Sequence, residues 1–74
     1  MTRYYYTYTP DTNSLERWNS KTEKFKAVEG SFADADDARK KAQADYDVMR
    51  KNVRGDVEGL FVAARSNLPY QYLD

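Results

Sequence analysis

The residues of this chain that could do chemistry are aromatic, acidic or basic, because the 74-residue sequence contains neither cysteine nor histidine. Without those two residue types there is no thiolate nucleophile, no imidazole that titrates near neutral pH and no typical zinc ligand set. The three glycines, Gly30, Gly55 and Gly59, are too scattered to form a phosphate-binding loop. We therefore expect neither an enzyme nor a protein that carries a cofactor.

One group of carboxylates, Asp34, Asp36 and Asp37, suggests a divalent metal. However, the glycine and the ligand spacing of a calcium-binding loop are absent from this segment. Acidic residues are also favoured in the first turn of a helix, where they interact with the positive end of its dipole. The sequence therefore predicts a helix start here and no metal site.

The residues that follow have the pattern of an amphipathic helix. Asp34 is a suitable N-cap, and Arg50, Lys51 and Arg54 lie at or just past the other end. At about 100° per residue, one narrow stripe that should face a sheet collects apolar side chains. Its members are Ala35, Ala38, Ala42, Tyr46, Met49 and Val53.

A run of basic residues, Arg39 to Lys41, lies on the same predicted helix. Lys40 follows Asp36 by four residues, and Lys41 follows Asp37 by the same spacing. This order favours ion pairs between successive helical turns. We expect a solvated, self-paired surface there and no site for phosphate.

Four segments have the composition of β-strands, three of them before the helix. Arg3–Thr9, Ser14–Asn19 and Glu23–Glu29 are separated by turn residues, and Val57–Arg65 follows the helix. The sequence thus predicts an α+β fold of order β-β-β-α-β. A three-stranded meander and a fourth strand would form a small antiparallel sheet packed on one α-helix. We expect a single domain over residues 1–65 and an irregular C-terminal tail over 66–74.

Alternation along the first strand predicts which side chains are exposed. Tyr4, Tyr6 and Tyr8 share one face, which should meet the helix and leave the opposite face in water. The candidate partner-binding residues on this water-facing side are Arg3, Tyr5, Thr7, Lys24, Lys26 and either Arg17 or Trp18. Tyrosine, tryptophan and arginine are common at binding hot spots, but the same residues also suit an ordinary solvated sheet face.

Charge and hydropathy narrow the choice of partners. The 12 basic residues equal the 12 acidic residues, although residues 29–38 carry four acids and no base. A chain with no net charge whose acidic and basic residues are grouped in separate segments favours a polarised surface and makes nucleic acid an unlikely partner. The sequence contains no signal-peptide pattern and no apolar stretch of about 20 residues, so we expect a cytoplasmic protein without a membrane partner.

These observations favour a non-enzymatic module that binds another protein. The small size, the missing cysteine and histidine, and the segregated charge are similar to those of the small inhibitors that bacteriophages and mobile elements direct against host proteins, here by occlusion. One alternative is a single-stranded nucleic-acid-binding protein that uses sheet tyrosines and basic residues. Another is a self-associating structural subunit, such as a homodimer, favoured by zero net charge and an N-terminal edge strand.

Overall fold

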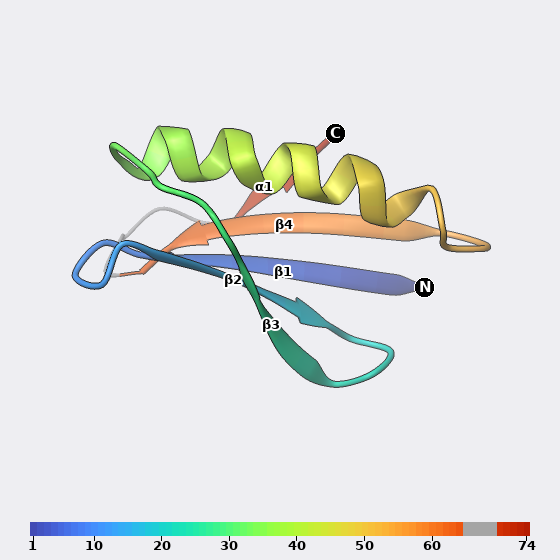
Figure 1. Cartoon of the computed structure of the whole chain (residues 1–74). Helices are drawn as coiled ribbons and strands as arrows, with labels where there is room; N and C mark the ends of the chain where they lie inside the picture. Colours follow the sequence, from blue (N-terminus) through green and yellow to red (C-terminus); the bar gives the residue numbers. More distant parts are fainter. Residues whose placement is uncertain (65–69) are drawn as a thin grey trace.

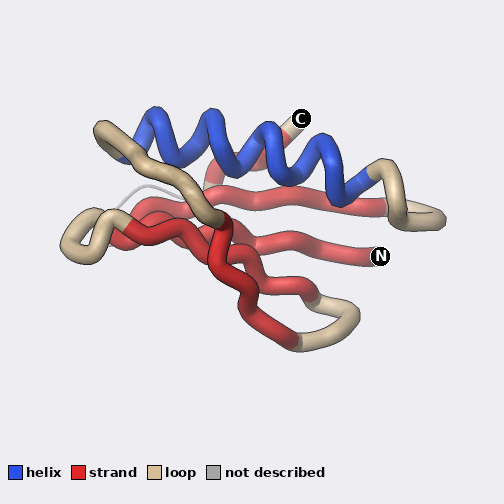
Figure 2. Tube along the Cα trace, in the orientation of Figure 1, coloured by secondary structure: helices blue, strands red, loops and turns tan. Residues whose placement is uncertain are grey.

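The computed structural model describes residues 1–64 and 70–74, in which one helix lies across one face of a β-sheet (Figure 1). The helix, α1, spans Ala35–Arg50. Figure 2 shows that the opposite face of the sheet carries no helix within the described residues. The strands are β1 (Thr2–Thr9), β2 (Ser14–Asn19), β3 (Lys24–Val28), β4 (Val57–Ala63) and β5 (Gln71–Leu73).

The strands lie in the order β3-β2-β1-β4-β5, so that β1 is central. The predicted α+β class is confirmed, but the sheet is mixed and not antiparallel, because β1 and β4 run parallel. β3 runs in the same direction as β1, and α1 then carries the chain back along the sheet, so β4 starts at the end of the sheet where β1 and β3 start. Because β4 pairs with the side of β1 that β2 leaves free, β1 and β4 are parallel.

The C-terminal residues contribute a strand where the sequence predicts an irregular tail. β5 pairs antiparallel with β4, with Leu60 opposite Tyr72. A three-residue strand is too short to show an alternating pattern, which is why the sequence does not reveal it. Residues 66–69 of the predicted tail lie outside the described residues. The N-terminal strand is therefore not an edge, and the edges of the described sheet are β3 and β5.

Asparagines shape both hairpin turns. Asn13 has a left-handed backbone (φ 50°), and its side-chain oxygen accepts a hydrogen bond of 2.9 Å from the Tyr8 hydroxyl. In the second turn the side-chain oxygen of Asn19 accepts from the Lys21 amide at 2.8 Å. Asparagine tolerates the left-handed region and caps nearby amides, so both residues favour turns at these positions.

The helix begins and packs as the sequence predicts. The Asp34 side chain accepts a hydrogen bond from the Asp37 amide at 2.9 Å, which makes Asp34 the N-cap. Ala38, Ala42 and Tyr46 are buried against the sheet. The small alanines let the helix approach the sheet closely, and the tyrosines of β1 fill the space between them. The core thus lies between α1 and the face that carries Tyr4, Tyr6 and Tyr8.

Candidate functional site

The face of the sheet that points away from α1 is the candidate functional site, and we call it the open face. The helix packs mainly over β1 and β4 on the other side (Figure 1). Since Tyr4, Tyr6 and Tyr8 of β1 are buried beneath the helix, the alternate residues Tyr5 and Thr7 belong to the open face. The strand registers then assign a side chain from every strand to this face.

On the open face, a row of side chains runs across the sheet, perpendicular to the strands, with one large apolar or aromatic residue from each of the five strands. Phe25 lies opposite Trp18, Trp18 lies opposite Tyr5, and Tyr5 lies opposite Leu60. Leu60 in turn lies opposite Tyr72 on β5. We call these five residues the cross-sheet row. The row crosses the whole described sheet, from one edge strand to the other.

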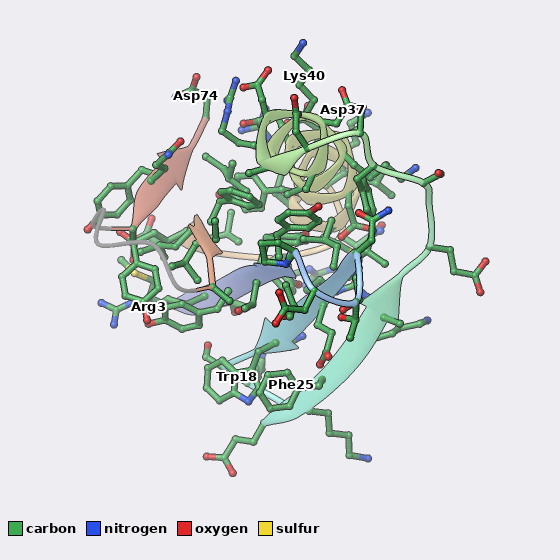
Figure 3. The ribbon with its side chains drawn as sticks, turned by 90° about the vertical axis from the view of Figure 1, so that its left-hand side faces the viewer. Arg3, Trp18, Phe25, Asp37, Lys40 and Asp74 are labelled. Atoms are coloured by element: carbon green, nitrogen blue, oxygen red, sulfur yellow. The ribbon has the colours of Figure 1, made fainter. Side chains whose placement is uncertain are left out.

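Three aromatic rings of the row, those of Tyr5, Trp18 and Phe25, contact one another in series, and a further tyrosine contacts Tyr5. The ring centroids of Tyr5 and Trp18 are 5.4 Å apart, and those of Trp18 and Phe25 are 6.4 Å apart. Figure 3 shows Trp18 and Phe25 next to each other at the outer side of β2 and β3. Tyr70, which precedes β5, places its ring edge-on against Tyr5 at 5.9 Å. Tilted and edge-on contacts are the favoured arrangements of aromatic pairs, so these rings stabilise one another.

Three of these rings are nevertheless open to solvent. The exposed fraction is 66% for Phe25, 54% for Tyr70 and 69% for Tyr72. A shallow groove of about 330 Å³ lies among the rings. It is lined by Tyr5, Thr7, Trp18, Phe25 and Tyr70. Large exposed aromatic side chains grouped in one place mark an interaction surface more often than scattered ones do.

The charges on the open face are few and partly paired. Arg3 and Glu58 lie opposite each other on β1 and β4, and Arg3 Nε contacts Glu58 Oε2 at 3.0 Å. The neighbouring Tyr5 hydroxyl and the Glu58 carboxylate both raise the pKa of the Arg3 guanidinium. Glu16 of β2 lies opposite Thr7 and is exposed. The open face therefore carries no net positive charge among its strand residues.

The structure brings together four of the predicted site residues. Arg3, Tyr5, Thr7 and Trp18 all lie on the open face, as the registers of β1 with β2 and β4 require. Whether these residues bind a partner stays a prediction.

Two other predicted site residues, Lys24 and Lys26, lie on the helix-side face of the sheet and not on the open face. Lys26 pairs with Arg17, and Lys24 pairs with Asn19, so these lysines share the helix-side face of the sheet. Placing both lysines in water would require Phe25, which alternates with them, to point to the core. Because the helix packs mainly over β1 and β4, most of β3 is exposed on both faces, and Phe25 is free to point outward.

Arg17 also lies on the helix side, where an ion pair links it to α1. Its Nη1 atom contacts Asp45 Oδ2 of α1 at 2.6 Å, and the Tyr6 hydroxyl donates to the same oxygen at 2.6 Å. Burial, reinforced by the hydrogen bond to Asp45, raises the pKa of Tyr6. Burial lowers the pKa of Arg17, but the hydrogen bond and charge of Asp45 more than offset this, so that it is raised overall. Of the alternatives Arg17 and Trp18, only Trp18 faces outward.

The acidic residues at the helix start take part in the helix itself. Asp36 contacts Lys40 at 3.5 Å and Arg39 at 3.5 Å, and Asp37 Oδ2 accepts from the Ala33 amide at 3.1 Å. Across residues 1–64 and 70–74, no group of three acidic side chains gathers into a site that could hold a metal ion. Within the same residues, no helix has the length and apolar character needed to cross a bilayer.

Sequence reasoning missed four residues of this surface. Phe25 alternates with two lysines that the sequence places in water, Leu60 is predicted only as part of a strand, and Tyr70 and Tyr72 fall in the predicted tail. The available signal was the pair Tyr70 and Tyr72, since tyrosines two residues apart share one face of a strand.

Comparison with known proteins gives no matching family model, no matching curated protein and no matching solved structure. The functional proposal therefore depends on the geometry of the open face.

Proposed function

We propose that this protein is a non-enzymatic module that binds another protein through the open face of its sheet. The observation that supports the proposal is the cross-sheet row, in which aromatic side chains from four strands and the buried Leu60 of β4 lie side by side across the sheet. Aromatic residues at the centre of such a surface, with polar residues around them, are typical of interface hot spots. A small rigid domain that covers a partner's surface would act on it by occlusion.

The placement of charge favours a protein partner over a nucleic acid. A nucleic-acid surface needs cations close to the rings, so that phosphates and bases are bound together. Here the Arg3 side chain is paired with Glu58, while Lys24 and Lys26 lie on the opposite face of the sheet. Arg17 is held under the helix by Asp45. The aromatic surface and most of the basic surface are therefore on different sides of β3 and β2.

A pull-down from cell extract with tagged protein tests the proposal. We expect the wild-type chain to retain a partner after nuclease treatment, and Phe25→Ala and Tyr72→Ala each to reduce its recovery. Both side chains are more than half exposed, so truncating them should leave the fold intact. Val48→Ala is the matched control, because Val48 is 59% exposed on the helix, away from the open face.

The outcome that contradicts the proposal is a partner whose recovery is the same for wild type, Phe25→Ala, Tyr72→Ala and Val48→Ala, or no retained partner at all. Loss of the partner on nuclease treatment would instead favour the nucleic-acid alternative. Recovery of only a second, differently tagged copy of the chain would favour self-association. Self-association cannot proceed through an N-terminal edge strand, because β1 is a central strand of the described sheet.

A further inference from the structure

The groove in the open face has walls of aromatic rings set at angles to one another. Trp18 is tilted by 48° to Tyr5 and by 53° to Phe25, while Tyr70 stands at 60° to Tyr5. The face of an aromatic ring carries partial negative charge and its edge partial positive charge, so a cation is attracted to a ring face. A compact cation in the groove can contact the rings that line it.

A carboxylate lies beside the same groove. Glu16 is opposite Thr7, which lines the groove, and opposite Ala27 on the other neighbouring strand. Directly opposite residues have Cβ atoms about 5 Å apart, so the Glu16 side chain starts next to the Thr7 end of the groove. It is also two residues from Trp18 along β2, on the same face.

This carboxylate differs from the other acid of the open face. Glu58 is paired with Arg3, and that pair lies on the opposite side of Tyr5 from Thr7. Glu16 is exposed, and it forms no ion pair within residues 1–64 and 70–74. The groove therefore has an acidic end near Thr7 and a neutralised end near Arg3.

We propose that this groove binds a cationic side chain of the partner protein, the guanidinium of arginine or the free or methylated ammonium of lysine. The cation packs against the rings that line the groove, with its charge toward the Thr7 end, beside which Glu16 lies. A neutral apolar group in the same place gains no attraction from the Glu16 carboxylate, whereas a cation does. The inference deepens the proposed function and rests on it, since it specifies the chemistry of the partner.

Trp18 supplies a direct readout, because it is the only tryptophan in the chain. The probes are blocked tripeptides Gly-X-Gly in which X is arginine, lysine, trimethyl-lysine or the uncharged norleucine. We expect the cationic peptides to change Trp18 fluorescence saturably and to bind about 3- to 30-fold more tightly than the norleucine peptide. The order of the three cationic peptides identifies which cation the groove prefers.

Two charge variants separate the contribution of Glu16 from a general effect of net charge. Glu16→Gln should weaken binding of the cationic peptides about threefold or more and leave the norleucine peptide unchanged. Asp36→Asn removes the same charge at the helix start, away from the open face, and should not affect any peptide. Far-UV circular dichroism of both variants confirms that the fold is retained.

The inference is overturned if norleucine binds as tightly as the cations, if Glu16→Gln behaves like Asp36→Asn, or if no cationic peptide gives a saturable change at Trp18. These outcomes are separate from failure of the proposed function. If Phe25→Ala loses the partner but Glu16→Gln retains it, the protein-binding proposal holds and the cation-binding inference is wrong. If the cationic peptides bind but no partner depends on the open face, the groove binds cations and the protein-binding proposal is wrong.

Discussion

The ring of Tyr46 lies directly over Gly59, so that β4 has no room for a side chain at this position. A Cβ atom built on Gly59 would be 2.8 Å from both Cδ1 and Cε1 of Tyr46. The Tyr46 hydroxyl also donates to the Val57 carbonyl oxygen at 3.3 Å, two residues earlier in the same strand. The absence of a side chain at Gly59 therefore fixes how closely α1 approaches β4.

Gly59→Ala should destabilise the fold through this contact. The added methyl group must push aside a ring that is itself buried, and overpacking of this kind costs about 1–3 kcal/mol. Urea unfolding followed by far-UV circular dichroism measures the change. In a Tyr46→Leu background the cost of Gly59→Ala should be smaller, because the smaller side chain can move. Equal costs in both backgrounds would show that the ring is not the obstacle.

The two faces of the helix should respond differently to the same substitution. Ala42 is fully buried against the sheet, so Ala42→Leu should overpack the core and cost about 1–3 kcal/mol. Ala44 is exposed, and Ala44→Leu should change the free energy of unfolding by less than about 0.5 kcal/mol. Equal effects in urea unfolding would mean that the helix packs through a different stripe.

The helix was the element that the sequence predicted best, because its evidence is local. The N-cap Asp34 follows from its residue type at the helix start, and the buried positions Ala38, Ala42 and Tyr46 follow from a period of about 3.6 residues. No pairing across the sheet is needed to find them. The position of Tyr5 on the open face, where it is half-buried, follows just as locally from strand alternation and the burial of its neighbours Tyr4 and Tyr6.

The parts that were mispredicted depend on contacts between distant segments. The alternation of Lys24 and Phe25 is equally consistent with either side chain pointing to the core. The choice is made by the reach of α1, which packs mainly over β1 and β4. The parallel pairing of β1 with β4 and the antiparallel pairing of β4 with β5 likewise require the sheet order, which no single segment contains.

Arg17→Ala should act on stability first and on binding only as a consequence. The Arg17 and Asp45 side chains are 12% and 22% exposed, and removing the cation leaves a carboxylate that still faces the Tyr6 hydroxyl. The expected cost is about 2–4 kcal/mol in urea unfolding, because a poorly hydrated charge loses its partner. Lys26→Ala, on the neighbouring exposed strand, should be nearly neutral. A small effect of Arg17→Ala would show that the ion pair with Asp45 is solvated like a surface pair and contributes little to stability.

The raised pKa of Tyr6 predicts that the fold weakens in alkali. At a pH above about 10, tyrosines in the unfolded chain lose their protons, whereas buried Tyr6 keeps its proton. The unfolded state then binds fewer protons than the folded state, so the free energy of unfolding falls as pH rises, by about 1.4 kcal/mol per pH unit for this group. Urea unfolding between about pH 8 and pH 11 measures the slope. Tyr6→Phe, although less stable at neutral pH, should show a shallower decline.

Oligonucleotide titrations distinguish a protein-binding surface from a nucleic-acid-binding one. We expect no measurable binding of single-stranded RNA or DNA at physiological salt, because the open face combines exposed rings with one paired base, Arg3. Fluorescence anisotropy of a labelled oligonucleotide measures this directly. If binding does occur through the basic side of β3, it should weaken steeply between about 50 and 200 mM salt and be lost in Lys24→Glu or Lys26→Glu. Micromolar binding at physiological salt that is abolished by Phe25→Ala would instead show that bases stack on the cross-sheet row, and the nucleic-acid alternative would then replace the proposed function.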